Sequence, residues 1–68
     1  MWIRSQDKIK LGDYKFIFIN GLRIDGETQL DVDTLGEYET KDRATEVLNS
    51  IHGNLVSKKE KVFQMPSA

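Results

Sequence analysis

The stretch TKDRATEVLNSIHGNL, residues 40–55, decides the fold of this 68-residue chain. Its apolar side chains recur at the spacing of a single helix face, while charged and polar side chains fill the opposite face. The apolar positions are Ala44, Val47, Leu48, Ile51 and Leu55. Because a helix with one apolar face has to bury it against another element, the stretch predicts one helix packed on a sheet built from the rest of the chain.

Local signals mark the ends of this helix. Thr40 is a suitable N-cap, because its hydroxyl can accept a hydrogen bond from a backbone N–H of the first turn, and Asp42 lies where the helix dipole favours negative charge. Gly53 leaves two ends open: the helix stops after His52, or it continues to Val56 with a weak point at the glycine.

The residues ahead of the helix have the alternation and turn signals of short strands. Residues 2–5 and 8–11 alternate apolar and polar side chains, which predicts two short strands or one bent strand. Gly12-Asp13 predicts a turn after them. Residues 14–19 then have the aromatic and β-branched content of a central strand.

Alternation along that central strand predicts that Tyr14, Phe16 and Phe18 share one face. Asn20-Gly21 follows and is the strongest turn signal in the chain, because both residue types tolerate the positive φ of a type I′ turn. We expect a hairpin there, returning through residues 22–24.

The sequence from Asp25 to Glu39 predicts a second turn and a further strand. Asp25-Gly26-Glu27 has the composition of a turn. The alternation that follows predicts a strand with Leu30 and Val32 facing inward and the neighbouring aspartates in solvent. Gly36 interrupts the last part of this strand and predicts a bulge or a close approach of another backbone.

After the helix, residues 57–61 have the composition of a solvated linker, and residues 62–65 have that of a final short strand before Pro66. The whole pattern predicts a single α+β domain over residues 1–68. Its sheet is expected to be mainly antiparallel, with four to five strands, one helix packed across it and a short C-terminal strand.

Composition restricts where such a chain can work. It has no cysteine, so a disulfide framework and thiolate metal sites are excluded. The longest apolar run, residues 16–19, is far too short to span a bilayer, and the amino-terminal residues lack the apolar run of a secretory signal. We therefore expect a soluble cytoplasmic protein without a membrane partner.

The charges are segregated along the chain although the net charge is only −1. Residues 1–24 carry five lysines and arginines against two aspartates, whereas residues 25–46 carry eight acidic residues against two basic ones. Cross-strand pairing between these segments is one expected outcome. The other is a polarised surface whose acidic side repels nucleic acid and fits a basic protein.

No pattern in the sequence points to catalysis, a cofactor or a metal. His52 is the only histidine and lies at the border of the apolar helix face, where a structural role is expected. The acidic residues from Asp25 to Asp33 lack the spacing of a calcium-binding loop, and the scattered glycines form no phosphate-binding loop. We expect a protein that is not an enzyme.

Nucleic-acid binding has some support in the basic amino-terminal strands. Phosphate contacts would come from Arg4, Lys8, Lys10, Lys15 and Arg23, with Trp2, Tyr14 and Phe16 as stacking platforms. Against this function, a pI near 5.7 is low for a nucleic-acid-binding protein, and a core under the helix needs the same aromatic rings.

Three blocks of the sequence carry a resemblance. The opening WIRSQDK (residues 2–8), the block LGEYETKDRATEVL (residues 35–48) and the ending VFQMP (residues 62–66) resemble small uncharacterised proteins of Gram-positive bacteria, often found on phages and other mobile elements. The resemblance implies a genomic setting and no known chemistry, so it carries over no catalytic or binding residue.

The candidate interface is Trp2 with Arg4 and Gln6. An exposed tryptophan beside an arginine is typical of an interface hot spot, and three polar residues after Trp2-Ile3 are hard to explain by packing. The alternative is structural: Trp2 covers the open face of the sheet and Arg4 pairs with an acidic strand.

These observations favour a non-catalytic protein–protein interaction module of a phage or mobile element. Its expected partner is an unknown protein or a second copy bound through a sheet edge. The alternative is a nucleic-acid-binding accessory protein that uses the basic amino-terminal strands. A third hypothesis is an acidic decoy surface that occupies a nucleic-acid-binding protein.

Overall fold

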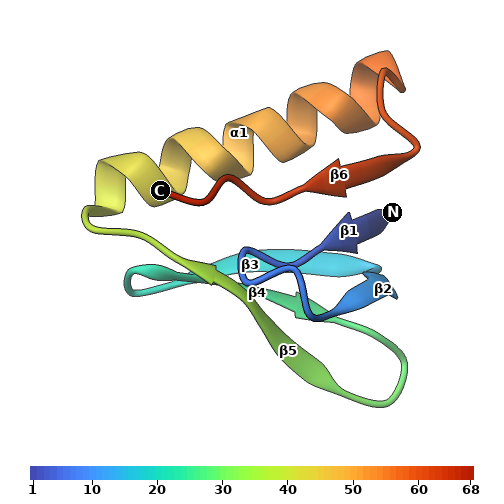
Figure 1. The fold of residues 1–68 in the computed structure, drawn as a ribbon, viewed down its shortest axis with the longest axis horizontal. Coiled ribbons are helices and arrows are strands. Elements are labelled where there is room, and N and C mark those ends of the chain that lie inside the picture. The colour runs from blue at the N-terminus through green and yellow to red at the C-terminus, as the bar shows by residue number, and fades with distance from the viewer.

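The computed structural model describes residues 1–68 as six strands and one helix (Figure 1). In chain order the elements are β1 (Trp2–Arg4), β2 (Leu11–Asp13), β3 (Phe16–Asn20), β4 (Arg23–Glu27), β5 (Val32–Glu37), α1 (Lys41–Ser57) and β6 (Val62–Gln64). The strands form a mixed sheet with the order β2-β1-β6 and an antiparallel sheet with the order β3-β4-β5. The predicted α+β class is confirmed, but the strands divide into two sheets of three instead of one sheet of four to five.

The division into two sheets occurs between β2 and β3. The backbone N–H of Tyr14 donates to the Met1 carbonyl at 2.9 Å, whereas that of Lys15 donates to the Glu27 carbonyl at 2.9 Å. Successive residues thus bond to different sheets, which makes a corner in the chain. This corner replaces the turn predicted at Gly12-Asp13, since both of those residues lie in β2.

The corner also separates side chains that were predicted to share a face. Tyr14 is 2% exposed and belongs to the core, whereas Phe16 is 60% exposed on the other side of the bend. Phe16 pairs with Phe18 on the outer face of the antiparallel sheet, with ring centroids 5.5 Å apart. Ile17 and Ile19 point the opposite way and pack against the core.

The hairpin between β3 and β4 is confirmed, with its turn shifted by one residue. Asn20 pairs with Arg23, so the turn residues are Gly21 and Leu22. Of these only Gly21 has a positive φ, +67°, which is the pattern of a type II′ turn and not of the expected type I′.

No turn forms at Asp25-Gly26-Glu27, because these residues belong to β4. A Cβ atom at Gly26 would lie 2.7 Å from Cδ1 of Tyr14 and 2.8 Å from Cδ1 of Leu35. The glycine therefore leaves room for two core side chains inside a strand, which explains why a turn-type residue occurs there.

The prediction that Leu30 and Val32 face inward is wrong. Leu30 lies in the turn before β5 and is 90% exposed, and Val32 is 56% exposed. The inward side chains of β5 are Asp33, which accepts a hydrogen bond from the Tyr14 hydroxyl at 2.8 Å, and Leu35, which is 1% exposed. The face of β5 is thus the reverse of the one that alternation indicated.

A bulge next to Gly36 confirms the interruption predicted there. Ile24 pairs with Gly36 while Asp25 pairs with Thr34, so Leu35 is the extra residue of β5. The bulge lets Leu35 and the following strand end turn toward the core.

The helix α1 begins as predicted, with the Thr40 hydroxyl accepting a hydrogen bond from the Arg43 N–H at 3.0 Å. It continues through Gly53, so the longer of the two predicted ends is correct. Lys58 ends it with a left-handed φ of 54° and donates its N–H to the Asn54 carbonyl at 2.7 Å. α1 packs on β3 and β4.

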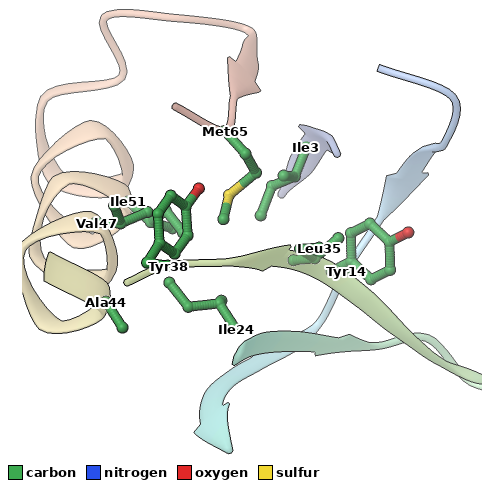
Figure 2. Close-up of a cluster of buried hydrophobic side chains, with 9 residues drawn as sticks. All are labelled: Ile3, Tyr14, Ile24, Leu35, Tyr38, Ala44, Val47, Ile51 and Met65. Atoms are coloured by element: carbon green, nitrogen blue, oxygen red, sulfur yellow. The ribbon is translucent and has the colours of Figure 1, made fainter. Parts of the chain in front are cut away.

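The core lies between the helix and the two sheets, as Figure 2 shows. Side chains reach it from every layer: from α1, from β1 and the residue after β6, and from β4, β5 and the segments beside them. The nine buried members are Ile3, Tyr14, Ile24, Leu35, Tyr38, Ala44, Val47, Ile51 and Met65. The predicted final strand β6 is confirmed and pairs parallel with β1.

Candidate interaction surface

The only histidine lies on the solvent side of α1. His52 is exposed and its side chain makes no hydrogen bond. It borders a shallow depression between α1 and β3 that Lys15, Phe16 and Leu55 also line, and no carboxylate lies among the lining residues. A general base needs an orienting partner of that kind. Nowhere do three or more His, Asp or Glu side chains gather as metal ligands.

Gln6 of the predicted interface holds two parts of the chain together. Its side-chain oxygen accepts the Glu37 N–H at 2.9 Å, and its amide nitrogen donates to the carbonyls of Glu37 and Ser67, both at 3.0 Å. Its backbone N–H donates to the Leu35 carbonyl at 2.7 Å. Gln6 thus occupies backbone groups at the free edge of β5, and its role is structural.

The loop after β1 has its own internal hydrogen bonds. Of the strand predicted at residues 8–11, only Leu11 is in a strand, as the first residue of β2. The buried Ser5 hydroxyl donates to the Asp7 carboxylate and accepts the Lys10 N–H at 3.0 Å. The hydrogen bond from the Ser5 hydroxyl, followed by the one that the Ile9 N–H donates to the same carboxylate, holds the pKa of Asp7 below its usual value. These hydrogen bonds therefore fix the conformation of the loop that follows β1.

Arg4 does not pair with an acidic strand. Its Nε donates to the Lys8 carbonyl at 3.1 Å, and its guanidinium forms no ion pair. Its other nitrogens stay available to a partner.

Trp2 and Arg4 lie on the outer face of the mixed sheet, because Ile3 between them points into the core and is fully buried. The register places Val62 beside Trp2 and Leu11 beside Arg4. Trp2 is 49% exposed, so its ring does not cover the sheet face completely and keeps much of its surface free. Of the three residues of the predicted interface, Trp2 and Arg4 share one exposed sheet face, whereas the Gln6 side chain bonds to the edge of β5.

A groove of about 270 Å³ runs beside Trp2. Three segments form it: Met1 and Trp2, the end of α1, and the connector between α1 and β6 (Figure 1). We call it the Trp2 groove. Its lining residues are Met1, Trp2, Asn54, Leu55, Lys58, Glu60 and Lys61.

Asn54 fixes the shape of the Trp2 groove. Its side-chain oxygen accepts the Glu60 N–H at 2.8 Å, and its amide nitrogen donates to the Glu60 carbonyl at 3.1 Å. Its backbone carbonyl accepts the Lys58 N–H at 2.7 Å. The connector is thus bound to the helix end, and the groove is formed before any ligand arrives.

The basic and acidic side chains, which are separated along the sequence, also lie on different parts of the folded protein. The mixed sheet with its loops is mainly basic, with Arg4, Lys8, Lys10, Lys58, Lys59 and Lys61 against Asp7, Asp13 and Glu60. Residues 24–40 contain six acidic side chains and no lysine or arginine. Only the Arg23–Asp25 pair, at 3.3 Å and within β4, joins the two charge segments, so the expected cross-strand pairing does not form.

The largest hollow, about 450 Å³, lies at the start of α1 and is bordered by the chain's own tail. The Tyr38 hydroxyl donates to the Pro66 carbonyl at 2.8 Å, and Arg43 donates to the Ala68 carbonyl at 2.9 and 3.1 Å. Burial raises the pKa of Tyr38. The three sequence blocks 2–8, 35–48 and 62–66 meet here, so their polar residues hold the fold together.

Sequence reasoning missed the residues that complete the Trp2 groove. Leu55 was assigned to the buried helix face but is 59% exposed. Lys58 and Lys61 carried no signal beyond linker composition, and Asn54 carried none beyond that of a helix end next to Gly53. They come together only because β6 lies beside β1, a pairing that no local pattern encodes.

No helix of the structure combines the length and the apolar character needed to cross a membrane. Comparison of the chain with protein-family models, with curated proteins and with solved structures found no match.

Proposed function

We propose that this protein is a non-catalytic module that binds another protein through the outer face of its mixed sheet and the Trp2 groove. The observation that carries the proposal is the half-exposed Trp2 at the mouth of a preformed groove. Tryptophan and arginine are enriched among residues that dominate binding energies, and here Trp2 and Arg4 share one exposed sheet face.

The charge around the groove indicates the kind of partner. Lys58 and Lys61 line it, with Glu60 as the only acidic lining residue. Such a site favours a partner whose apolar side chain is flanked by carboxylates, because opposite charges speed encounter and exclude basic competitors.

A capture experiment tests this function. The double variant Trp2→Ala with Arg4→Ala is used as bait in a lysate beside the unchanged protein, and bound proteins are identified by mass spectrometry. We expect one or more partners to be lost with the double variant. Val56→Ala is the matched control, because Val56 is 73% exposed on α1 and does not line the groove, so it should keep the same partners.

Thermal unfolding of the same variants completes the test. Because Trp2 and Arg4 are exposed, we expect the double change to alter the free energy of unfolding by less than about 1 kcal/mol. A large loss of stability, or capture of the same proteins by all three baits, would contradict the proposal.

Nucleic-acid binding is the second candidate, favoured by the basic side chains that surround Trp2 on the mixed sheet and by the ring pair of the exposed Phe16 with the partly buried Phe18. A titration with labelled single-stranded DNA and RNA at two salt concentrations tests it. Phosphate contacts would make the affinity fall steeply with salt. Absence of binding at low salt would exclude this candidate.

We also propose a setting for the module, namely the cytoplasm of a Gram-positive bacterium carrying a phage or mobile element. The support is the resemblance of the three blocks at residues 2–8, 35–48 and 62–66 and the lack of cysteine. Fractionation of cells that express the protein at its natural level tests the location.

A further inference from the structure

The turn between β4 and β5 presents an exposed leucine on a rigid support. The Thr28 N–H donates to the Asp31 carbonyl at 2.8 Å, and the Thr28 hydroxyl accepts the Asp31 N–H at 3.0 Å and the Leu30 N–H at 3.3 Å. Leu30 is nevertheless 90% exposed. We call residues 28–31 the Leu30 turn. Because hydrogen bonds fix this turn, the exposed Leu30 side chain can enter a pocket of a partner without further ordering of the backbone.

The sequence neighbours of Leu30 are acidic and partly apolar. Glu27 and Asp31 flank the leucine, and Val32, 56% exposed, extends its apolar surface. No basic side chain lies nearby in sequence, since the chain has none between Arg23 and Lys41. The turn therefore combines an apolar side chain with carboxylates, which is the chemistry that the basic rim of the Trp2 groove favours.

Both features lie at the same end of the molecule. In Figure 1 the segments that line the Trp2 groove, namely the end of α1, the connector to β6 and the chain next to the N-terminus, lie at the upper right, and the β4–β5 connection that contains the Leu30 turn lies at the lower right. A two-fold axis at that end would bring each turn of one copy to the groove of the other. Both contacts would then form at once and close the assembly as a dimer instead of an open chain.

We propose that the protein forms a two-fold dimer in which the Leu30 turn of each copy occupies the Trp2 groove of the other. Leu30 packs against Trp2 and Leu55, and Asp31 faces Lys61. This inference rests on the proposed interaction function, because it uses the same groove, and it names a second copy of the chain as the occupant.

Sedimentation velocity over a concentration series measures the dimer directly. Trp2 supplies a second readout, since it is the only tryptophan and is half exposed in the monomer. We expect its emission to shift to shorter wavelength as the protein concentration rises through the dissociation constant. A monomer with unchanged emission at every concentration would overturn the inference.

The variant Leu30→Ser removes the knob without touching the core. We expect it to raise the dimer dissociation constant about tenfold or more, because each of the two contacts loses the burial of a leucine. Ile9→Ser is the matched control, because Ile9 is 81% exposed, lines neither feature and should leave the dimer unchanged. Equal dimerisation of the Leu30→Ser variant would place the interface elsewhere and overturn the inference.

Charge exchange identifies the contact itself. Asp31→Lys alone and Lys61→Glu alone each put like charges together in both contacts, so each variant should be monomeric. An equimolar mixture should form a heterodimer, because one contact then keeps the native pair and the other has both charges reversed. Failure of the mixture to associate would contradict the assigned pairing.

The results also separate this inference from the proposed function. If the unchanged protein is monomeric while the Trp2→Ala, Arg4→Ala variant loses a captured partner, the inference fails and the function stands. If dimerisation follows the Leu30 and charge variants, the inference holds, whatever further proteins the bait captures.

Discussion

Tyr14 shows at the scale of one residue how the two sheets are joined. A Cβ atom at Gly12 of the mixed sheet would lie 2.9 Å from the Tyr14 ring, and one at Gly26 of the antiparallel sheet 2.7 Å from it. The hydroxyl donates to Asp33 at 2.8 Å. Burial, followed by the hydrogen bond to Asp33 and the charge of that carboxylate, raises the pKa of Tyr14 to about 12.

The raised pKa of Tyr14 makes stability depend on alkaline pH. The unfolded chain loses the phenolic proton near pH 10, whereas the folded chain keeps it to about pH 12. The protonated phenol therefore stabilises the fold fully below pH 10, and this contribution is lost as the pH rises toward 12. We expect Tyr14→Phe to cost about 1–2 kcal/mol at pH 7 and to flatten the decline in this window, as measured by urea unfolding at several pH values. An unchanged pH dependence in the variant would contradict this assignment.

Two glycines should respond in opposite directions to the same substitution. Gly26→Ala puts a methyl group against the buried Tyr14 and Leu35, and such overpacking costs about 1–3 kcal/mol. Gly53→Ala lies in the interior of α1 with no neighbouring atom within 4 Å of the new Cβ, and it should stabilise the protein by about 0.5–1 kcal/mol. For a chain of this size each kcal/mol shifts the Tm by roughly 4–8 °C, so thermal unfolding resolves both effects. Changes of the same sign at the two positions would be inconsistent with the packing described.

At the scale of elements, the first turn of α1 depends on its cap. Thr40→Ala removes the acceptor of the Arg43 N–H and should lower the free energy of unfolding by about 1 kcal/mol. Thr45→Ala is the control within the same helix, because Thr45 is exposed and alanine has the higher helix propensity. Circular dichroism during urea unfolding checks both, and a loss at Thr45 as large as that at Thr40 would argue against a capping role.

The free edge of β5 depends on Gln6. Gln6→Ala removes three side-chain hydrogen bonds and frees the Glu37 N–H and carbonyl for pairing with another strand. We expect a loss of about 1–2 kcal/mol in stability together with faster aggregation. Light scattering over time measures the aggregation, with Gln29→Ala, an exposed position whose side chain makes no hydrogen bond, as the control. Equal aggregation of the two variants would contradict the edge role.

Elements were predictable where their signals were local. The cap at Thr40, the apolar spacing of α1 and the turn glycine Gly21 each act within a few residues, and each was found. The inward face of β5 was not predicted correctly. The Thr28 hydroxyl accepts hydrogen bonds from the N–H groups of Leu30 and Asp31, which places Leu30 in a turn, and the bulge at Leu35 shifts the register. Alternation alone carries neither effect.

The candidate surface was predictable to a similar degree. Trp2 and Arg4 were selected by residue type, because a tryptophan close to an arginine is unusual in a small core, and both are exposed on one sheet face. The hydrogen bonds of Gln6 depend on the edge of β5, where Glu37 lies 31 positions further along the chain. The helix end around Asn54 likewise reaches Trp2 only through the tertiary fold.

At the scale of the whole molecule, the last strand and the tail close the core. Met65 is 1% exposed within the core, and β6 is a neighbour of β1. Deletion of residues 62–68 should therefore leave a chain without cooperative unfolding, because a core methionine alone is worth about 2–5 kcal/mol and a 68-residue protein has only about 3–10 kcal/mol in total. Deletion of residues 67–68 removes only exposed hydrogen bonds and should preserve the transition. Calorimetry on the two truncated chains checks this, and a cooperative transition without β6 would refute it.

The parallel pairing of β1 with β6 also determines when the core can form during translation. On the ribosome Trp2, Ile3 and Arg4 are made some sixty residues before β6, which is one of the two strands beside them. The β3–β4 hairpin can close during synthesis, but the apolar Ile3 stays without its full cover until translation has passed Met65. Such long-range closure is slow compared with hairpin formation. A pause of the ribosome before residue 62 would therefore release a half-built protein to chaperones and proteases.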